Sequence, residues 1–141
     1  MPTFALPEAA AWRLIDVPMR ADERGLLGVV EAVPGVPFDM RRVFFVTRVA
    51  EGCRRGAHAH RTLRQLLVCV SGQVEVVLDD GNRREQITLD GPARALYIPP
   101  MTWATQESKA PDTTYLVLAD QPYDEGDYIR NYDDFLAAAR A

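Results

Sequence analysis

Apolar and polar residues alternate over short stretches along most of the chain, and turn-forming residues separate these stretches. β-branched and aromatic residues are frequent within them, as is typical of strands. Asp80-Gly81 is the strongest tight-turn signal between two consecutive stretches. The pattern predicts strands over residues 26–33, 41–49, 63–70, 73–81, 84–89, 93–100 and 113–120.

Many short strands separated by frequent turns predict an all-β fold, either a sandwich or a barrel. Only the end of the chain has a different pattern. There Asp133 is the predicted N-cap of a short C-terminal helix, and Phe135 and Leu136 are its apolar anchors before the alanine-rich end.

The composition narrows the class of protein further. A chain of 141 residues with 48% hydrophobic and 26% charged residues fits a single globular domain over residues 1–141. It has no apolar run of membrane-spanning length and no signal-peptide pattern at its start. A net charge of −4 argues against broad nucleic-acid binding, and two cysteines are too few for a disulfide framework. We therefore expect a cytoplasmic protein with no membrane and no nucleic-acid partner.

Both histidines of the chain lie in one H-x-H pair, His58 and His60. On a strand, residues two apart point to the same face, so both rings would enter the interior of a small barrel. The spacing from Gly52 to Gly72 is that of the first cupin motif, G-x5-H-x-H-x4-E-x6-G, with Gln65 in place of the glutamate.

The metal ligands of a cupin are incomplete in this sequence. The best match to the second cupin motif, P-x-G-x-x-H, is residues 99–104, where Met101 replaces the glycine and Ala104 the histidine. A cupin metal normally takes three imidazoles and a carboxylate, whereas Gln65 is a neutral donor and Ala104 offers none. We therefore expect no bound metal.

Two interpretations of the histidine pair remain. The rings can simply pack inside the barrel, or they can transfer protons, because an imidazole titrates near neutral pH. Two rings on one cavity are hard to explain as packing when arginines flank them on both sides, and this favours acid–base chemistry. These arginines are Arg54, Arg55, Arg61 and Arg64.

At this point the chain resembles a known family. The run RRGAHAHRTLRQLLVCVSGQVEVVLDDG, the middle LDGPARALYIPP and the ending YDEGDYIRNYDDF are similar to the dTDP-4-keto-6-deoxyglucose 3,4-ketoisomerases, which are small cupins. The similarity extends over about residues 20–136. It implies a double-stranded β-helix, or jelly roll, in a homodimer that exchanges an N-terminal strand. It also implies a dTDP-linked keto-deoxyhexose as substrate and no metal or organic cofactor.

The reaction of that family suits the residues present. Moving a ketone from C4 to C3 requires removal of the C3 proton, an enediol intermediate and delivery of a proton to C4. A neutral imidazole is a suitable base, and a second donor must neutralise the enolate oxygen. The two motif histidines of the family correspond to His58 and His60. We assign His60 as the C3 base and His58 as its relay or orienting partner, although the sequence does not separate this assignment from its reverse.

Two departures from the family pattern concern the site. The strand before the motif often carries an active-site tyrosine in this family, but here it has Phe44 and Phe45. The family also tends to show Trp-His after the second proline turn, where this chain has Trp103-Ala104. The predicted site therefore lacks a phenol and a histidine, and either loss would alter the stereochemistry, the sugar or the activity.

Other residues are candidates for binding the substrate. Arg42, Gln65 and Tyr97 are candidates for the hydrogen bond that the missing phenol would make. Arg54 and Arg64 would bind the diphosphate, unless they are solvated surface residues. Trp103 would stack on the sugar or the thymine, unless it packs in the core. The acidic residues of the ending, Asp127 among them, are expected to form a solvated face.

Two other functions remain as alternatives. A related dTDP-sugar epimerase would need a His–Asp pair with an opposing tyrosine, which the sequence around His58 does not show. A non-catalytic cupin that binds nucleotide sugars would account for both departures from the family pattern.

Overall fold

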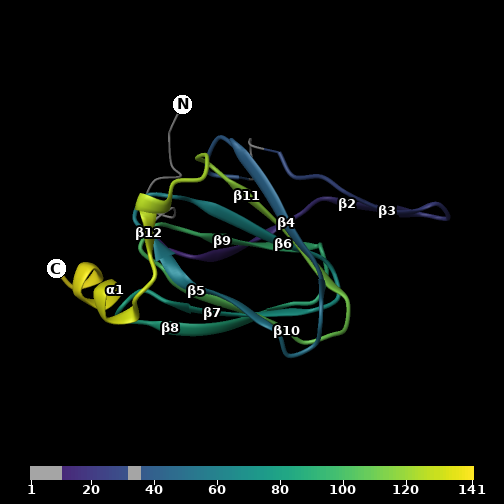
Figure 1. Cartoon of the computed structure of the whole chain (residues 1–141). Helices are drawn as coiled ribbons and strands as arrows, with labels where there is room; N and C mark the ends of the chain where they lie inside the picture. Colours follow the sequence, from purple (N-terminus) through teal and green to yellow (C-terminus); the bar gives the residue numbers. More distant parts are fainter. Residues whose placement is uncertain (1–10, 32–35) are drawn as a thin grey trace.

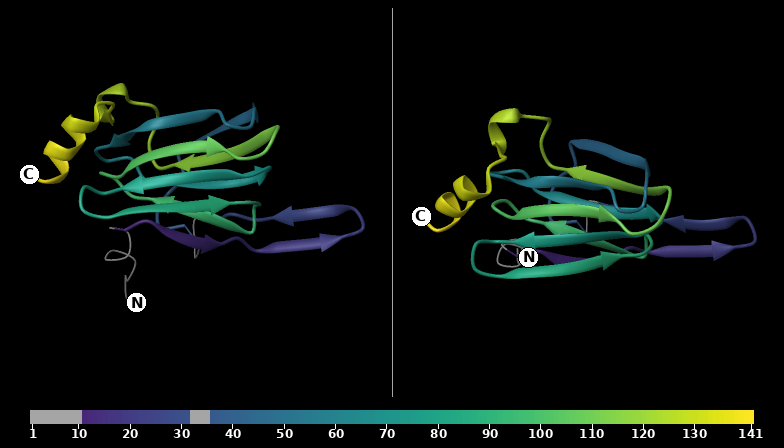
Figure 2. Two further views of the ribbon diagram at one scale, coloured as in Figure 1. Left: turned by 90° about the horizontal axis from the view of Figure 1, so that it is seen from below. Right: turned by 60° about the horizontal axis from the view of Figure 1, so that its bottom comes forward.

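The computed structural model describes residues 11–31 and 36–141 of the chain (Figure 1). Two five-stranded antiparallel sheets pack face to face in this part of the chain. A two-stranded hairpin projects from one end of the molecule, and a short helix lies at the other end (Figure 2). This arrangement confirms the predicted all-β class with a short C-terminal helix.

Apart from the hairpin of β7 and β8, neighbouring strands in the two five-stranded sheets are not consecutive in the chain, as is typical of a jelly roll. The first sheet has the order β1-β9-β6-β11-β4, the second has the order β12-β5-β10-β7-β8, and β2 pairs with β3 alone. The strands are β1 (Arg13–Asp16), β2 (Met19–Asp22), β3 (Gly25–Gly28), β4 (Arg42–Val49), β5 (Arg54–His60), β6 (Gln65–Ser71), β7 (Val74–Asp79), β8 (Arg84–Leu89), β9 (Arg94–Ile98), β10 (Trp103–Ser108), β11 (Thr113–Ala119) and β12 (Tyr128–Ile129). The helices are the 3-10 helix η2 (Glu125–Asp127) and α1 (Tyr132–Ala139).

The main hydrophobic core lies between the two sheets. In β7, alternate residues Val74, Val76 and Leu78 are fully buried there, as the period-two pattern predicts. By contrast, β6 is buried on both faces, because a second apolar cluster around Phe38 covers its outer side. The double burial explains why β6 has a continuous apolar run instead of an alternation.

The predicted strand positions hold for most of the molecule. The strand predicted over 84–89 has the bounds of β8, and β4 and β11 agree with their predicted ranges within one residue. The strand predicted over 93–100 ends at Ile98, since the prolines that follow cannot donate to a ladder. β10 was not predicted because its inward positions, Ala104, Gln106 and Ser108, give no apolar alternation.

Two predictions at the ends of the chain need correction. β3 (Gly25–Gly28) covers only residues 26–28 of the strand predicted over 26–33, because β2, its only partner among the described residues, is four residues long. Residues 32 and 33 of that prediction lie outside the described residues. The N-cap of α1 is Asn131 and not Asp133, since the Asn131 side chain accepts a hydrogen bond from the Asp134 amide.

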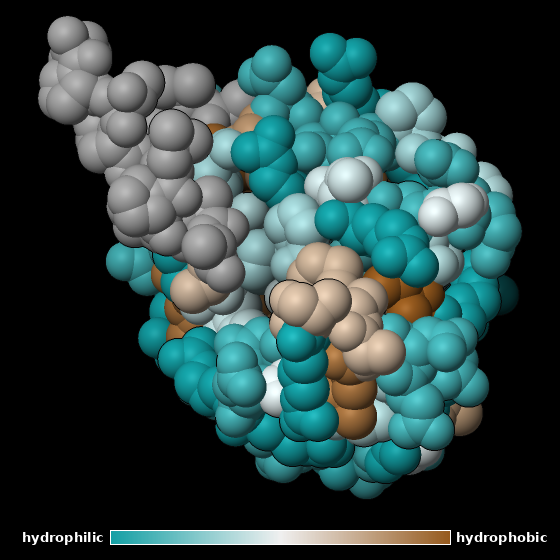
Figure 3. All heavy atoms as spheres, turned by 90° about the vertical axis from the view of Figure 1, so that its left-hand side faces the viewer, coloured by the Kyte–Doolittle hydropathy of each residue, from teal (hydrophilic) through white to brown (hydrophobic). Residues whose placement is uncertain are grey.

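The chain segment before α1 connects the helix to the histidine strand. β12 pairs with β5 so that Tyr128 lies opposite His60, and Ile129 lies opposite Ala59. Ile129 and Ala59 form a third apolar cluster with Phe135 of α1, which is fully buried. The surface at this end of the molecule is mostly hydrophilic, and its largest group of apolar residues lies near the centre of the view (Figure 3). Within the described residues, no helix is long and apolar enough to cross a membrane.

Candidate active site

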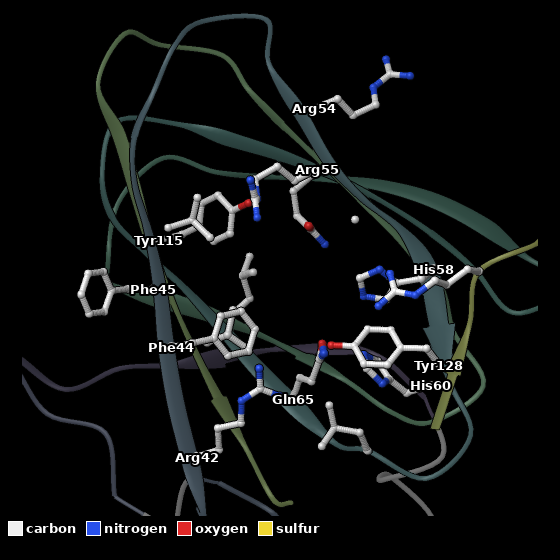
Figure 4. A pocket seen from close by; sticks show the side chains of 17 residues that line it. Arg42, Phe44, Phe45, Arg54, Arg55, His58, His60, Gln65, Tyr115 and Tyr128 are labelled. Carbon is white, nitrogen blue, oxygen red and sulfur yellow. The ribbon is translucent and has the colours of Figure 1, made fainter. Parts of the chain in front are cut away.

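A cavity of about 520 Å³ opens between β4, at the edge of the first sheet, and β5 with β12, at the edge of the second (Figure 4). Side chains from both sheets and from the segment around β12 face it. The lining residues are Arg42, Phe44, Phe45, Val46, Arg54, Arg55, Gly56, His58, His60, Leu63, Gln65, Leu67, Gln106, Tyr115, Val117, Tyr128 and Arg130.

A bulge in β5 positions the two histidines. Gly56 and Ala57 have positive φ angles of 89° and 62°, and the pairing of β5 with β10 shifts register at this point. A Cβ atom at Gly56 would lie 2.8 Å from the carbonyl oxygen of Ala104, so only glycine fits. Such bulges re-aim the side chains that follow them, here His58 and His60.

His58 and His60 face the same cavity, as their spacing on a strand predicts. Their ring centroids are 5.1 Å apart, and the two rings meet edge to face at 85°. The ring of Tyr128 completes the group, with its centroid 4.9 Å from that of His58 and 4.3 Å from that of His60. Three rings that can exchange protons or hydrogen bonds are therefore in mutual contact on one wall of the cavity.

A buried carboxylate holds His60. The His60 Nδ1 atom lies 3.2 Å from Oδ2 of Asp127, and both side chains are less than 10% exposed. Asp127 also accepts hydrogen bonds from the Thr62 amide and hydroxyl and from the Leu63 amide. Since the carboxylate accepts only, Nδ1 of His60 donates, and Nε2 is the unprotonated nitrogen.

The prediction of a solvated acidic face is wrong for Asp127, which is 7% exposed. The prediction that no His–Asp pair exists near the histidine motif is wrong for the same reason. His60 and Asp127 lie 67 positions apart in the chain, and the pairing of β12 with β5 brings them together.

Both imidazoles are neutral at neutral pH. Burial lowers the pKa of His58 to about 4, and the neighbouring His60 and Arg130 act in the same direction. Burial also lowers the pKa of His60 below its usual value, although Asp127 opposes this shift. Nδ1 of His58 is buried without a hydrogen-bond partner among the described residues.

The cavity carries positive charge. Of its described lining residues, Arg42, Arg54, Arg55 and Arg130 are arginines and none is an aspartate or glutamate. Carboxylates outside the cavity pair with two of them, since Glu107 lies 2.8 Å from Arg54 and Glu125 lies 2.8 Å from Arg130. The described lining would therefore attract an anionic ligand, which would compete with Glu107 for Arg54 and with Glu125 for Arg130.

The structure brings only part of the predicted site together. His58, His60, Arg42, Arg54 and Gln65 line the cavity.

Three predicted residues lie elsewhere. Arg64 pairs with Asp120 at 2.8 Å, next to a separate cavity. Tyr97 is fully buried in the apolar cluster outside the first sheet. Trp103 packs against Tyr132 and Phe135 beside α1.

The cavity contains phenol groups, although the strand before the histidine motif has none. Phe44 faces the cavity, and Phe45 is 66% exposed and points away from it (Figure 4). Tyr128 and Tyr115 line the cavity instead. Asp127 and Tyr128 both lie in the ending YDEGDYIRNYDDF, which carries part of the family resemblance but gives no sign in the sequence that it reaches the histidines.

The donors near the histidines do not form a metal site. Ala104, which replaces the third cupin histidine, lies directly opposite His58 in the ladder between β5 and β10. Gln65 is the cavity residue at the position of the cupin glutamate. The described residues contain no group of three or more His, Cys, Asp or Glu side chains that could hold a metal ion.

A jelly roll with two neutral imidazoles in an arginine-lined cavity defines a small cupin equipped for acid–base chemistry on an anionic ligand. The comparison with known proteins gives the particular family. The chain belongs to the family "FdtA: WxcM-like, C-terminal", whose model matches residues 10–140.

Curated and solved relatives agree with this family. The chain is 44% identical over 114 residues to the TDP-4-oxo-6-deoxy-alpha-D-glucose-3,4-oxoisomerase of Aneurinibacillus thermoaerophilus, covering 81% of this chain and 82% of that protein. QdtA, a sugar 3,4-ketoisomerase from Thermoanaerobacterium thermosaccharolyticum solved in complex with TDP, superposes with a TM-score of 0.87 at 37% identity, covering 92% of this chain and 94% of that chain.

A histidine-to-asparagine variant of QdtA, solved with TDP-4-keto-6-deoxyglucose, superposes with the same TM-score of 0.87 at 36% identity and the same coverage of 92% and 94%. The fold is therefore that of the cupin-like ketoisomerases, and the chain is an enzyme of the isomerase class.

Proposed function

We propose that this chain is a sugar 3,4-ketoisomerase that converts TDP-4-keto-6-deoxyglucose to a TDP-3-keto-6-deoxyhexose by metal-free histidine chemistry. The observation that carries the proposal is the pair of neutral imidazoles, His58 and His60, facing a cavity lined by arginines. The relatives named for this reaction, 44% and 37% identical to this chain, support the choice of substrate.

His60 is the better placed of the two as the C3 base. Its Nδ1–H donates to Asp127, and this hydrogen bond fixes the tautomer whose Nε2 lone pair can accept a proton. When Nε2 takes the C3 proton, the nearby Asp127 carboxylate stabilises the imidazolium that forms. The same imidazolium can then return the proton to C4 of the enediol.

His58 then acts as a partner of the base. Its low pKa of about 4 keeps it neutral, so it does not repel the imidazolium formed on His60. With Nδ1 enclosed by protein, only Nε2 is available to a ligand. His58 therefore makes one hydrogen bond to the sugar and orients it against His60.

The arginines of the cavity suit the charged part of the substrate. A nucleoside diphosphate is an anion that guanidinium groups bind through paired hydrogen bonds. Arg54 is 67% exposed at its side chain, and Arg42 stacks on the Phe44 ring at 4.6 Å. We assign Arg54 and Arg42 to the diphosphate and the sugar, respectively, with Gln65 near the histidines as a further polar contact.

A homodimer with an exchanged N-terminal element forms part of the proposal. The hairpin β2–β3 projects from the body of the molecule, and Leu26 and Leu27 are both 59% exposed on it (Figure 1). An isolated two-stranded hairpin is marginally stable in water. At its base lies an apolar groove of about 390 Å³, lined by residues 15–18 and 29–31 and by Val36. A second copy of the chain would cover both surfaces.

The His60–Asp127 pair makes a sugar-nucleotide epimerase the second candidate. An epimerase must deliver its proton to the face opposite the base. Tyr128 lies on the strand adjacent to His60, on the same wall of the cavity. Tyr115 comes from the opposite sheet, but it is 3% exposed and its hydroxyl is engaged by Arg55. The geometry therefore favours removal and return of the proton on the same face of the sugar. This is compatible with isomerisation by one base and not with epimerisation.

The test is to incubate the protein with TDP-4-keto-6-deoxyglucose in deuterated water and to follow the sugar by NMR. We expect exchange or relocation of the C3 proton and formation of the 3-keto isomer. His60→Asn should lower turnover by about 10²–10⁴-fold, the usual effect of removing a positioned general base. TDP affinity should stay within a few-fold of the wild type, and His58→Asn should slow turnover to a smaller extent.

Two outcomes would refute the proposal. Exchange at C5 with inversion would identify an epimerase. Binding of TDP with neither exchange nor product from any 4-keto sugar nucleotide would identify a binding protein on an enzyme scaffold.

A further inference from the structure

Two of the arginines that line the cavity are held by carboxylates outside its lining. Arg54 begins β5 and Arg130 follows β12, on the side of the second sheet where the cavity opens. Both side chains are more than half exposed, and their partners are Glu107 and Glu125, respectively. An anionic ligand therefore meets an existing ion pair at either arginine, and the geometry of each pair decides whether the ligand adds to it or replaces it.

The pair formed by Arg54 leaves room for a second anion. Only Nη2 of Arg54 donates to Glu107, at 2.8 Å. Lys109 donates to the other oxygen of Glu107 at 2.9 Å, so this carboxylate has a second cationic partner. A phosphate can therefore bind the remaining N–H groups of Arg54 while the ion pair with Glu107 stays in place.

The pair formed by Arg130 is different, because Glu125 occupies the side of the guanidinium that a phosphate would use. Nε donates to one oxygen of Glu125 at 2.8 Å, and Nη2 donates to the other at 2.9 Å. Arginine binds carboxylates and phosphates alike through such paired hydrogen bonds. The hydrogen bonds from Arg130 and Tyr123 lower the pKa of Glu125 to about 2, so this residue is an anion at neutral pH.

Arg130 lies where the charged part of the proposed substrate must pass. Its guanidinium carbon is 4.1 Å from the centre of the Tyr128 ring, and that ring contacts both histidines (Figure 4). Its positive charge also contributes to the low pKa of His58. In the proposed function the sugar lies against His58 and His60. Because the diphosphate is attached directly to that sugar, its negative charge lies beside the histidines, within reach of Arg130.

We propose that Arg130 binds the diphosphate of the substrate, and that Glu125 is an internal competitor, which occupies Arg130 until the diphosphate displaces it. The inference rests on the proposed function. It adds a residue to the substrate site and identifies the carboxylate that limits the affinity of this site.

The exchange favours a diphosphate over weaker anions. The Glu125 side chain is 57% exposed and can turn into water, and an exposed ion pair contributes little to stability. The diphosphate of a nucleotide sugar is a dianion that can accept from both nitrogens of Arg130, so it replaces the single charge of Glu125. After the reaction Glu125 can return to Arg130, which speeds the release of the product.

Glu125→Gln tests the competition, because the amide keeps the size of the side chain and can still accept from Tyr123 but has no charge. The Kd for TDP, measured by isothermal titration calorimetry, should fall by about two- to fivefold, the effect expected for an exposed ion pair. Arg130→Met, which keeps an aliphatic side chain on the Tyr128 ring, should raise this Kd by at least about fivefold through loss of charged hydrogen bonds.

The NMR signal of the Arg130 Nε–H group reports the exchange directly, and it is identified by its absence in Arg130→Met. This signal should differ between the free wild-type and Glu125→Gln proteins, because Glu125 is its hydrogen-bond partner. With TDP bound it should move in both proteins to the same position, because the partner is then the diphosphate.

The matched control is Asp133→Asn, which removes an exposed carboxylate in the first turn of α1 and should bind TDP as the wild type does. An unchanged or raised Kd in Glu125→Gln would overturn the proposal, because Glu125 would then orient Arg130 instead of competing for it. An Arg130 signal that does not respond to TDP would also overturn it. A wild-type protein that shows the expected exchange at Arg130 but isomerises no keto sugar would refute the proposed function and leave the competition established.

Discussion

At the scale of single residues, the site depends on how Asp127 is held. Burial acts to raise the pKa of this carboxyl, but the hydrogen bonds from Thr62 and Leu63 outweigh burial and lower it, so the group is ionised. One oxygen accepts from the Thr62 amide and hydroxyl, and the other accepts from Leu63 and His60. Because the Asp127 carboxylate accepts all four hydrogen bonds, it fixes both the orientation of the His60 ring and its tautomer.

Asp127→Asn should therefore lower activity although the asparagine side chain fills the same space as the aspartate. An amide has one acceptor oxygen and one NH₂ group, so its NH₂ group must face either the Thr62 donors or the pair formed by Leu63 and His60. In the second orientation His60 must accept at Nδ1 and carry its proton on Nε2, which removes the base. We expect a fall in kcat of roughly 10–10³-fold and a loss of about 1–3 kcal/mol in stability.

Steady-state kinetics and urea unfolding would measure the two effects. Asp133→Asn, which changes an exposed carboxylate in the first turn of α1, is the control and should leave both unchanged. An Asp127→Asn enzyme with the wild-type kcat would show that the carboxylate does not set the tautomer.

The low pKa values of the histidines predict how stability depends on pH. The pKa of His58 is lowered by burial to about 4 from 6.5, so the unfolded chain binds more protons between these values. Stability should consequently be full above pH 6.5 and fall as pH decreases toward 4. The His60 pKa is shifted in the same direction.

Urea unfolding at pH 7.5 and pH 5 would test this dependence. His58→Asn, which cannot take up the proton, should lose about 1 kcal/mol less than the wild type between the two values. Equal losses in both proteins would show that His58 does not contribute.

At the scale of elements, the proposed mechanism and the proposed dimer each depend on one short element, β12 and the hairpin β2–β3. β12 has only two residues, yet it carries Tyr128 and connects Asp127 to the histidine strand. It is held in place by α1, whose Phe135 is fully buried against Ala59 and Ile129. Within residues 11–31 and 36–141, the hairpin β2–β3 pairs with no other strand, and it exposes apolar residues on both faces.

Replacing the hairpin leucines should dissociate the proposed dimer. In Leu26→Asp/Leu27→Asp, two charges would have to be buried at the interface, which is costly without partners. Light scattering should give a dimer for the wild type and a 15.8 kDa particle for the variant at micromolar concentration. Val70→Asp, at an exposed apolar residue outside the hairpin, should remain dimeric. A wild-type protein that is monomeric under these conditions would contradict the prediction.

At the scale of the whole molecule, charge is distributed unevenly. The chain has a net charge of −4, whereas the described lining of its main cavity includes four arginines and no carboxylate. In a molecule of negative net charge, a positively charged cavity attracts anionic ligands, whereas the rest of the surface repels them. This distribution suits the nucleoside diphosphate of the proposed substrate.

The same cavity leads us to predict that activity needs no metal. Gln65 and Ala104 stand where a cupin has two of its ligands, and His58 and His60 alone are a poor site for a divalent ion. Elemental analysis of the purified protein should find well below one transition metal per chain, and a chelator should not change the isomerisation rate. One tightly held iron, nickel or zinc per chain, with activity lost on its removal, would contradict this prediction.

The sequence by itself determined the features that depend on neighbours in the chain. Period-two alternation placed β4, β7 and β8, because side chains along a strand alternate between the core and the opposite face. The H-x-H spacing put His58 and His60 on one face for the same reason. The missing metal ligands could also be identified from spacing alone.

Only the tertiary structure decided what completes the site. Asp127 and Tyr128 follow the histidines by more than sixty residues, and they meet them because β12 adds to the edge of β5. Tyr97 and Trp103 have the right chemistry but lie on the wrong sides of their sheets, in apolar clusters away from the cavity. Local patterns give the direction of a side chain relative to its own strand. Which distant strand lies beside it depends on tertiary packing, here on α1, whose Phe135 packs against Ala59 of β5 and Ile129 of β12.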